Sequence, residues 1–281
     1  MDSMPPFRHH KPLEVAPDTY LIRQVVGEGT PAPVHVYINS LVINGKEPVI
    51  VDAGFPNNRE HWINDVFSIV DPRDVRWIFL SHDDADHWGN LREAMEMCPN
   101  ATLVTNWFSV ERLAGVYDFP LERMRWVNDG DTFDAGDRTF AAIRPPIFDA
   151  PTTRGLYDPK TGVYWSSDAF GTPILSPVEN VAELDPDFWE QGSGYFSQLV
   201  CPWLEVVDHD KFIRTVDRIA RLEPKVIVGG HGPAITGENI ARTLEFARRA
   251  PLLPPAELPG QAELEAMVVG MTHASEEQEA A

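Results

Sequence analysis

The sequence predicts a single layered α/β domain, and three observations carry that prediction. Short runs rich in β-branched and aromatic residues alternate with runs at helical spacing. The 281 residues are 43% hydrophobic, which is ample material for a buried core. Several strand-like runs end in loops that carry histidine or aspartate. We expect this domain to occupy residues 1–250, with an acidic, proline-rich tail over residues 251–281.

In the first half of the chain, strand-like runs alternate with runs whose apolar positions recur at helical spacing. Trp62, Val66 and Val70 show that spacing in the first expected helix. The pattern stops at Asn128–Asp131, a turn-forming sequence. The expected order is a strand over 33–43, its hairpin partner over 48–54, a helix over 58–70, a strand over 75–81, a helix over 91–97, a strand over 101–105 and a helix over 107–113.

The second half also begins with strands and continues with helices. Pro145-Pro146 and the turn at 158–162 separate short extended runs. Phe212, Val216 and Ile219 lie on one face of an expected helix. The expected order is strands over 139–143 and 162–166, helices over 188–207 and 209–222, a strand over 225–228 and a helix over 237–249.

Composition restricts the classes of partner. The formal charge is −20 and the sequence pI is about 4.7, which argues against binding nucleic-acid phosphates or an anionic membrane surface. Neither a basic, apolar secretion signal nor a bilayer-length apolar run is visible, so we expect a cytoplasmic protein. Cys98 and Cys201 are too few for a disulfide framework, and we interpret both as small buried hydrophobic residues.

The segment Ser81–Asn90 contains the strongest chemical signal, because it places two histidines and three aspartates within six residues. It follows a predicted strand directly and precedes a predicted helix. Such a loop can direct imidazole and carboxylate groups at a metal ion. The alternative is an acidic, solvated turn that caps a helix, but such a turn requires neither the histidines nor the apolar strand behind them.

Two further segments fit the same site. Trp165–Gly171 places Asp168 just after a predicted strand, and Val228–Pro233 does the same with His231. Loops at strand ends are where layered α/β folds gather ligands and catalytic groups. We therefore expect Asp168 and His231 to join the residues of the earlier loop.

These three segments together resemble the metallo-β-lactamase superfamily, whose HxHxDH loop appears here as HxDxDH. The chain is most similar to the oxygen-binding diiron branch, which includes the lactamase-like domain of flavodiiron proteins. That branch has a carboxylate at the third motif position and segments similar to SSDAFG and HGP. The likeness extends from about Val34 to Arg249. It implies a four-layer αββα sandwich.

The resemblance also implies a ligand set for two metal ions. One ion would be bound by His82 and Asp84, the second by Asp86, His87 and His231, with Asp168 as the bridge. Asp86 and Asp168 are also the residues to which the resemblance gives catalytic roles.

One position departs from the family pattern. Where the branch has a histidine in a segment resembling HSPGT, this chain has Phe148–Arg154, which places Asp149 at the ligand position. With Asp149 bound, the first ion would have one imidazole and three carboxylates as ligands. The alternative is that Asp149 is a turn residue before Ala-Pro and that the first ion binds weakly or not at all.

Carboxylate-rich coordination favours iron, with zinc or manganese as alternatives. Two adjacent ions can lower the pKa of a bound water toward about 7 and polarise a substrate oxygen. From this we predict a metallo-hydrolase acting on a small, possibly aromatic ester, thioester, lactone or activated aryl ether.

The alternative is a diiron redox or sensor protein that binds dioxygen or nitric oxide. That chemistry requires electrons, and no flavin-phosphate loop or rubredoxin-like cysteine pair is visible in the sequence. This alternative therefore needs a separate electron donor. The expected partners are a small-molecule substrate and either further copies of the chain or a partner subunit, with no nucleic acid and no membrane.

Overall fold

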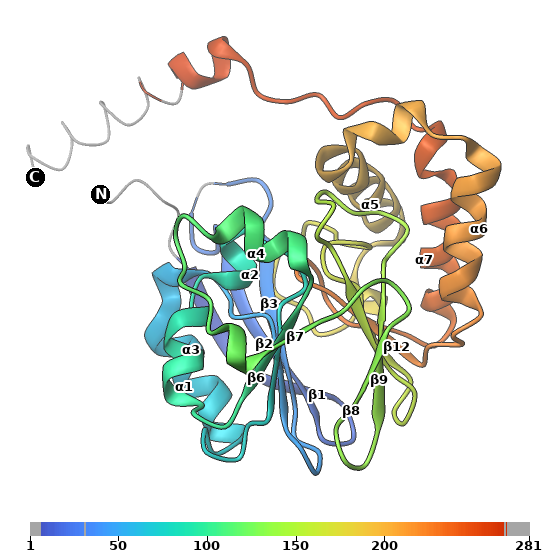
Figure 1. Cartoon of the computed structure of the whole chain (residues 1–281). Coiled ribbons are helices and arrows are strands. Elements are labelled where there is room, and N and C mark those ends of the chain that lie inside the picture. The colour runs from blue at the N-terminus through green and yellow to red at the C-terminus, as the bar shows by residue number, and fades with distance from the viewer. Residues whose placement is uncertain (1–6, 31, 267, 269–281) are drawn as a thin grey trace, which may run out of the picture.

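The computed structural model describes residues 7–30, 32–266 and 268. Two β-sheets pack face to face, and helices cover the outer face of each sheet (Figure 1). Within the described residues, the first sheet has seven strands in the order β1 to β7, and the second has six in the order β13-β12-β11-β10-β9-β8. This arrangement confirms the predicted αββα sandwich.

The first sheet combines an antiparallel half with a parallel half. Strands β1 to β4 pair antiparallel, and β4 to β7 pair parallel through helical crossovers. Its elements are β1 (Phe7–Ala16), β2 (Thr19–Val26), β3 (Val36–Ile43), β4 (Val49–Val51), η1 (Pro56–Asn58), α1 (Arg59–Ile69), β5 (Trp77–Phe79), α2 (Ala85–Trp88), α3 (Leu91–Met97), β6 (Thr102–Thr105), α4 (Trp107–Leu113), η2 (Leu121–Arg123) and β7 (Met124–Trp126).

The second sheet is antiparallel except for one pair, since β11 and β12 run parallel. Its elements are β8 (Thr132–Asp134), β9 (Thr139–Ile143), β10 (Gly155–Asp158), β11 (Val163–Trp165), η3 (Val181–Glu183), α5 (Pro186–Val200), η4 (Pro202–Val206), α6 (His209–Ala220), β12 (Val226–Val228), β13 (Ile235–Thr236), α7 (Glu238–Arg249) and η5 (Ala250–Leu252).

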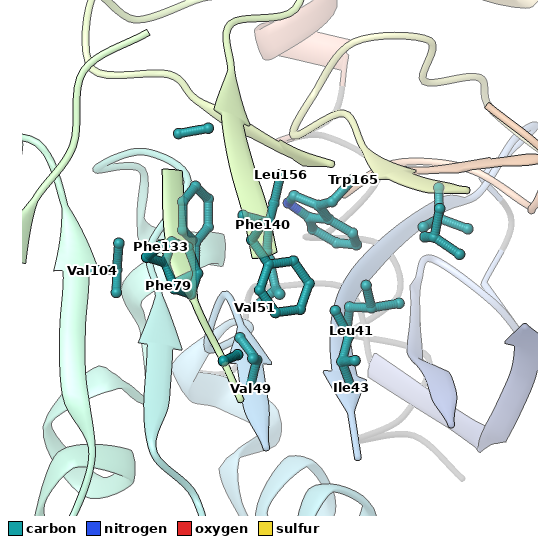
Figure 2. Close-up of a cluster of buried hydrophobic side chains, with 14 of the residues drawn as sticks. Leu41, Ile43, Val49, Val51, Phe79, Val104, Phe133, Phe140, Leu156 and Trp165 are labelled. Atoms are coloured by element: carbon teal, nitrogen blue, oxygen red, sulfur yellow. The ribbon is translucent and has the colours of Figure 1, made fainter. Parts of the chain in front are cut away.

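Three separate apolar clusters correspond to the three interfaces between four layers. The cluster between the sheets includes Leu41, Phe133 and Trp165 (Figure 2). A second cluster, which includes Trp62, joins the first sheet to α1 and α3, and a third, which includes Phe212, joins the second sheet to α5, α6 and α7. Because the middle of each sheet is buried on both faces, its central strands are apolar throughout rather than alternating, as in β4, β5, β11 and β12.

Most predicted elements are present, and the differences have physical causes. The helix predicted over 188–207 ends at Val200, because Pro202 lacks the amide proton that a continuing helix needs; a 3-10 helix follows. The chain also begins with two strands that the sequence did not predict, β1 and β2. Strand β1 is a polar edge strand with no buried residue, so its pattern carries little strand signal.

The sheets bring several strand ends together at one end of the sandwich. Strands β4 and β5 are parallel, as are β11 and β12, so the loops that follow each pair leave the same edge of a sheet. Cys98 and Cys201 are buried and unpaired, as predicted. Among the described residues, no helix is both long enough and apolar enough to cross a membrane.

Candidate metal centre

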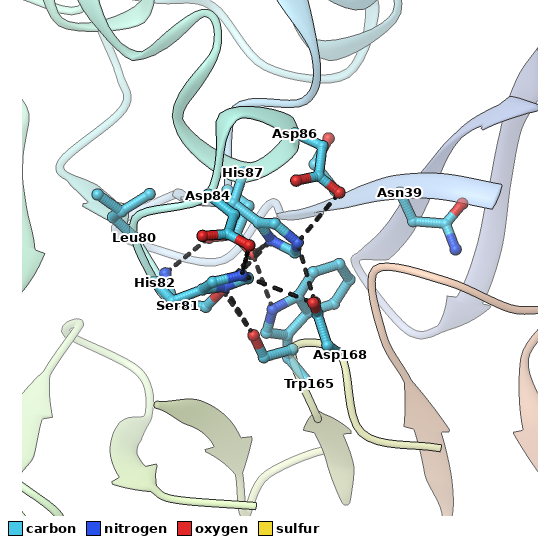
Figure 3. Close-up of polar contacts among 12 residues, drawn as sticks. Asn39, Leu80, Ser81, His82, Asp84, Asp86, His87, Trp165 and Asp168 are labelled. Carbon is cyan, nitrogen blue, oxygen red and sulfur yellow. Dashed lines mark hydrogen bonds and ion pairs between the residues drawn. The ribbon is translucent and has the colours of Figure 1, made fainter. Parts of the chain in front are cut away.

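The seven predicted ligand residues converge at this end of the sandwich, and Figure 3 shows five of them labelled. Their nitrogen and oxygen atoms form three overlapping groups, and within each group the atoms lie within 4.8 Å of one another. The groups are His82 with His87 and Asp168, Asp86 with His87 and His231, and His82 with Asp84 and Asp149.

The short helix α2 explains the spacing of the loop. Asp84 lies at its N-cap position in an extended conformation, and Asp86 and His87 lie within its single turn. Just before it, the backbone amide and hydroxyl of Ser81 donate to the Asp52 carboxylate at 2.7 and 2.6 Å. The loop is thus attached to the end of strand β4 before it reaches the ligand residues.

On one side of the centre, each imidazole is oriented by a partner on a strand or strand end. His87 Nδ1 lies 2.8 Å from the Asp52 carboxylate, and His231 Nδ1 lies 2.8 Å from the Tyr37 carbonyl oxygen. A neutral imidazole that donates through Nδ1 presents the lone pair of Nε2, and metal-bound histidines have this arrangement. Asp86 Oδ2 completes the group, 3.3 Å from His231 Nε2 and 3.6 Å from His87 Nε2.

On the other side, loops supply the carboxylates. His82 Nε2 lies 3.9 Å from Asp84 Oδ2 and 3.7 Å from Asp149 Oδ2. The Thr152 hydroxyl donates to Asp83 at 2.5 Å, which connects the Asp149 loop to the HxDxDH loop. Asp149 therefore lies where the sequence placed it, next to His82.

Asp168 lies between the two sides. Its carboxylate oxygens are 3.6 Å from His82 Nε2, 2.9 Å from His87 Nε2 and 3.5 Å from His231 Nε2. Ligand atoms about 2 Å from one ion lie roughly 3 Å or more from each other, so these separations suit ions held between the side chains. No other carboxylate in the three groups contacts all three histidines.

The shifts in pKa of the buried histidines and of Asp168 indicate a strongly negative electrostatic potential at the centre. Burial alone would lower the pKa of His87, but Asp168, Asp86 and Asp52 outweigh it and hold that pKa well above its usual value. Burial would likewise lower the pKa of His231, but Asp168 and Asp86 outweigh this effect and raise that pKa to about 9. For Asp168, burial would raise the pKa, yet the three imidazoles hold it well below the usual value. A field that favours protons on buried imidazoles also attracts cations.

Unpartnered polar atoms indicate that the residues fit metal ions. His82 Nε2 is buried and makes no hydrogen bond within the described part of the chain, and the buried His87 Nε2 and Asp168 Oδ1 lie 2.9 Å apart without hydrogen-bond geometry. Buried polar atoms without partners are rare, because each loses its water without compensation. Gly230 belongs to the same arrangement, since a Cβ there would lie 2.8 Å from His87 Cε1.

Sequence reasoning missed the residues that orient the candidate ligands. Asp52 accepts from Ser81 and Trp165 and contacts His87, and Ser167 contacts His82 Nδ1 at 3.1 Å. Asp52 and Ser167 also have positive φ angles of 57° and 55°. A signal for Asp52 was present, because it directly follows an apolar strand that neighbours the strand before the HxDxDH loop.

Comparison with curated proteins gives relatives that contain this region as one part. An uncharacterised protein of Methanocaldococcus jannaschii is 28% identical over 211 residues, covering 75% of this chain and 52% of that protein. A putative diflavin flavoprotein of Nostoc is 26% identical, covering 70% of this chain and 33% of that protein. The anaerobic nitric oxide reductase flavorubredoxin of Pectobacterium atrosepticum is 25% identical, covering 60% and 34%. The chain thus spans about half or less of these relatives' length.

Solved structures share the fold at lower identity. The flavodiiron protein of Giardia intestinalis has a TM-score of 0.75 and 19% identity, covering 87% of this chain and 60% of that one. Rubredoxin oxygen:oxidoreductase of Desulfovibrio gigas has a TM-score of 0.76 and 17% identity, covering 88% and 63%. These similarities support the fold.

The comparisons correct one prediction from the sequence. We predicted a metallo-hydrolase, and that prediction is wrong: the relatives with named activities are flavoproteins and a nitric oxide reductase, which are redox proteins. The predicted ligands could bind ions that activate water, and we took hydrolysis to be the reaction that this water performs. A shared metal centre does not determine its reaction, because the same ligands hold ions for either chemistry.

A family model described as ODP family beta lactamase matches residues 36–232. This range is more than half of the chain and contains every predicted ligand, from His82 to His231. The chain belongs to the ODP family of the metallo-β-lactamase superfamily.

Proposed function

We propose that this chain holds two iron ions in the centre described above and there reduces dioxygen or nitric oxide with electrons from a separate donor. The observation that carries the proposal is the convergence of seven histidine and aspartate side chains into overlapping groups. The names of the relatives, among them flavorubredoxin and flavodiiron protein, support a redox reaction over other chemistry.

The proposed ligand set follows from proximity. One ion is assigned His82, Asp84 and Asp149, and the other is assigned Asp86, His87 and His231. Asp168 is assigned to both ions, because it lies close to all three histidines. In this proposal Asp149 takes the place of a family histidine.

Iron is the proposed metal because of the donor atoms. Four carboxylates and three imidazoles form the set, and hard oxygen donors favour iron or manganese over softer-ligand metals. The carboxylate at position 149 increases the negative charge on one side only. That charge stabilises the more highly charged, oxidised state of the ion beside it.

The bound ions would pass on the electrons of the separate donor and provide the binding positions for the gas. The chain's own residues do the rest. Asp52 and the Tyr37 carbonyl keep His87 and His231 oriented through their Nδ1 atoms. Phe196, buried with its ring centroid 5.3 Å from that of His231, keeps water from one side of the centre. A dry surrounding favours uncharged gases over charged molecules.

The test is a gas-consumption assay on protein purified without oxygen. We expect about two irons per chain, and rapid consumption of dioxygen or nitric oxide when a chemical reductant and a mediator are supplied. A variant with both His87 and His231 replaced by Ala should lose iron and consume neither gas. Full iron content with no consumption of either gas would overturn the proposal.

Two further expectations belong to this proposal. Residues 1–250 are proposed as the metal-binding domain and residues 251–281 as an extension of it. A cytoplasmic location and assembly with further copies or a donor protein are also proposed, since a reductase of this kind needs access to reducing partners.

A further inference from the structure

A cavity of about 550 Å³ lies between α5, α7 and the segment 253–257. None of the residues that line it belongs to the metal-binding groups. Its volume falls within the range of roughly 300–1,000 Å³ that is typical of small-molecule sites. We propose that this cavity is a second binding site, for a flat, uncharged, mainly aromatic molecule that carries one hydrogen-bond donor.

Helix α5 supplies one wall through residues on a single face. Gln191, Gly194, Tyr195 and Gln198 line the cavity, and their spacing of three and four residues places them side by side along the helix. Gly194 lets Leu253 of the opposite wall pack closely against the helix, since a Cβ at position 194 would lie 2.8 Å from Leu253 Cδ1. A larger residue at position 194 would therefore fill the cavity or displace Leu253.

The apolar part of the wall favours a flat aromatic ligand. Tyr195 and Phe246 present aromatic rings to the cavity, and Leu253 and Pro254 face them from the covering segment. Phe246 is held in place by edge contact with Trp189, with ring centroids 5.0 Å apart. Rings fixed by packing favour stacking or edge contacts with another ring.

Two of the three charged side chains that line the cavity form an ion pair, and the third, Glu257, is exposed. Arg249 Nη2 lies 2.7 Å from Glu190 Oε1, so one guanidinium and one carboxylate form an ion pair. The Tyr195 hydroxyl donates to the Glu257 carbonyl oxygen at 3.2 Å. Arg249 is therefore not free to bind an anion, and solvent screens the exposed Glu257 carboxylate, so we assign the cavity an uncharged ligand.

Gln198 supplies the polar specificity. Its side chain is 3% exposed, and its Nε2 donates to the Ala250 carbonyl oxygen at 2.6 Å. That bond fixes which end of the amide carries the oxygen, since a carbonyl accepts only from the NH₂ group. Gln198 Oε1 is then buried with no hydrogen-bond partner among the described residues. A ligand with an O–H or N–H donor would satisfy it.

Two matched probes test the proposal with the full chain in its metal-bound form. We would titrate 2-naphthol and 2-methoxynaphthalene by isothermal titration calorimetry, since they share a ring system and differ in the donor. We expect one site per chain, with 2-naphthol binding about tenfold more tightly because of its bond to the buried oxygen. Equal affinities for the two probes would overturn the proposal.

Two variants locate the binding. Gln198→Met keeps the volume but removes the acceptor, so it should abolish the preference for 2-naphthol while 2-methoxynaphthalene binds as before. Gly194→Leu should abolish binding of both probes. Unchanged binding by Gly194→Leu, or a preference that survives Gln198→Met, would refute this location. Metal content is measured in each variant to confirm that the fold is intact, and this readout keeps the result independent of the proposed gas chemistry.

Discussion

The two sides of the metal centre are built differently. On the side of His87 and His231, each imidazole is oriented by a group on a strand or strand end: the Asp52 carboxylate or the Tyr37 carbonyl. On the side of His82, the carboxylates come from loops, and the Asp84 side chain is 49% exposed. The comparison indicates that the proposed ligands of one ion are held in place by strands, whereas the proposed ligands of the other depend on how two loops are held.

The His82 side therefore depends on the contacts between the HxDxDH loop and the loop that carries Asp149. Asp83 is buried, accepts from the Thr152 hydroxyl and pairs with Arg112. Asn106 adds a hydrogen bond to the Thr152 carbonyl oxygen at 2.6 Å. These contacts hold the loop that carries Asp149, while no strand supports Asp149 directly.

The largest expected effect comes from removing the residue that both sides share. Asp168→Ala should lose both ions, because Asp168 contacts all three histidines. Metal analysis after desalting measures the loss. Asp118→Ala, which changes an exposed aspartate, is the control and should keep both ions. Retention of one full equivalent by Asp168→Ala would show that Asp168 serves one ion only.

Asp149→Ala should separate the two sides. We expect metal content to fall from two ions per chain toward one, because only the His82 side loses a ligand. Asp149→His, which restores the family residue, should keep two ions. If Asp149→Ala binds two ions as tightly as the original chain, Asp149 is a turn residue and the ligand set proposed above is wrong.

Asp52→Asn should weaken the other side. The change removes the charge that orients His87, and loss of such a partner lowers metal affinity by about 10–100-fold. Competition with a chelator measures that change. Combined with Asp149→Ala, it should leave no tightly bound ion; if the double variant retains one, both substitutions act on the same ion.

A smaller effect is expected from the contact between the loops. Thr152→Val removes the hydroxyl bonded to Asp83 and should lower affinity for the His82-side ion about three- to tenfold. The control is Thr243→Val, since the Thr243 hydroxyl is buried in α7 and makes no hydrogen bond within the described residues. Equal affinity in the two variants would mean that the Asp83 contact does not support the Asp149 loop.

The smallest expected effect on the metals comes from the tail. Deleting residues 252–281 should leave both ions in place, because none of the described residues there belongs to a metal-binding group. The same deletion should abolish 2-naphthol binding, since residues 253–257 form a wall of the cavity. Loss of metal in the deletion would show that the tail supports the centre.

Much of the fold was predictable because its signals are local. The helices over 91–97 and 107–113 have the predicted bounds, since their apolar spacing reflects burial on one face. The strand β1 was not predictable, because an exposed edge strand lacks an apolar pattern. Helix α5 was predicted too long, since the apolar residues beyond Pro202 pack in a 3-10 turn instead.

The sequence by itself determined which residues are candidate ligands and the family, because those signals are short motifs with fixed spacing. Only the tertiary structure brought Asp149 next to His82 and Asp52 next to His87, since these contacts join segments far apart in the chain. The cavity beneath residues 253–257 is likewise a product of packing between α5, α7 and that segment. The sequence carries no pattern that predicts the volume of this cavity or the unpartnered oxygen of Gln198, because both depend on how distant elements pack together.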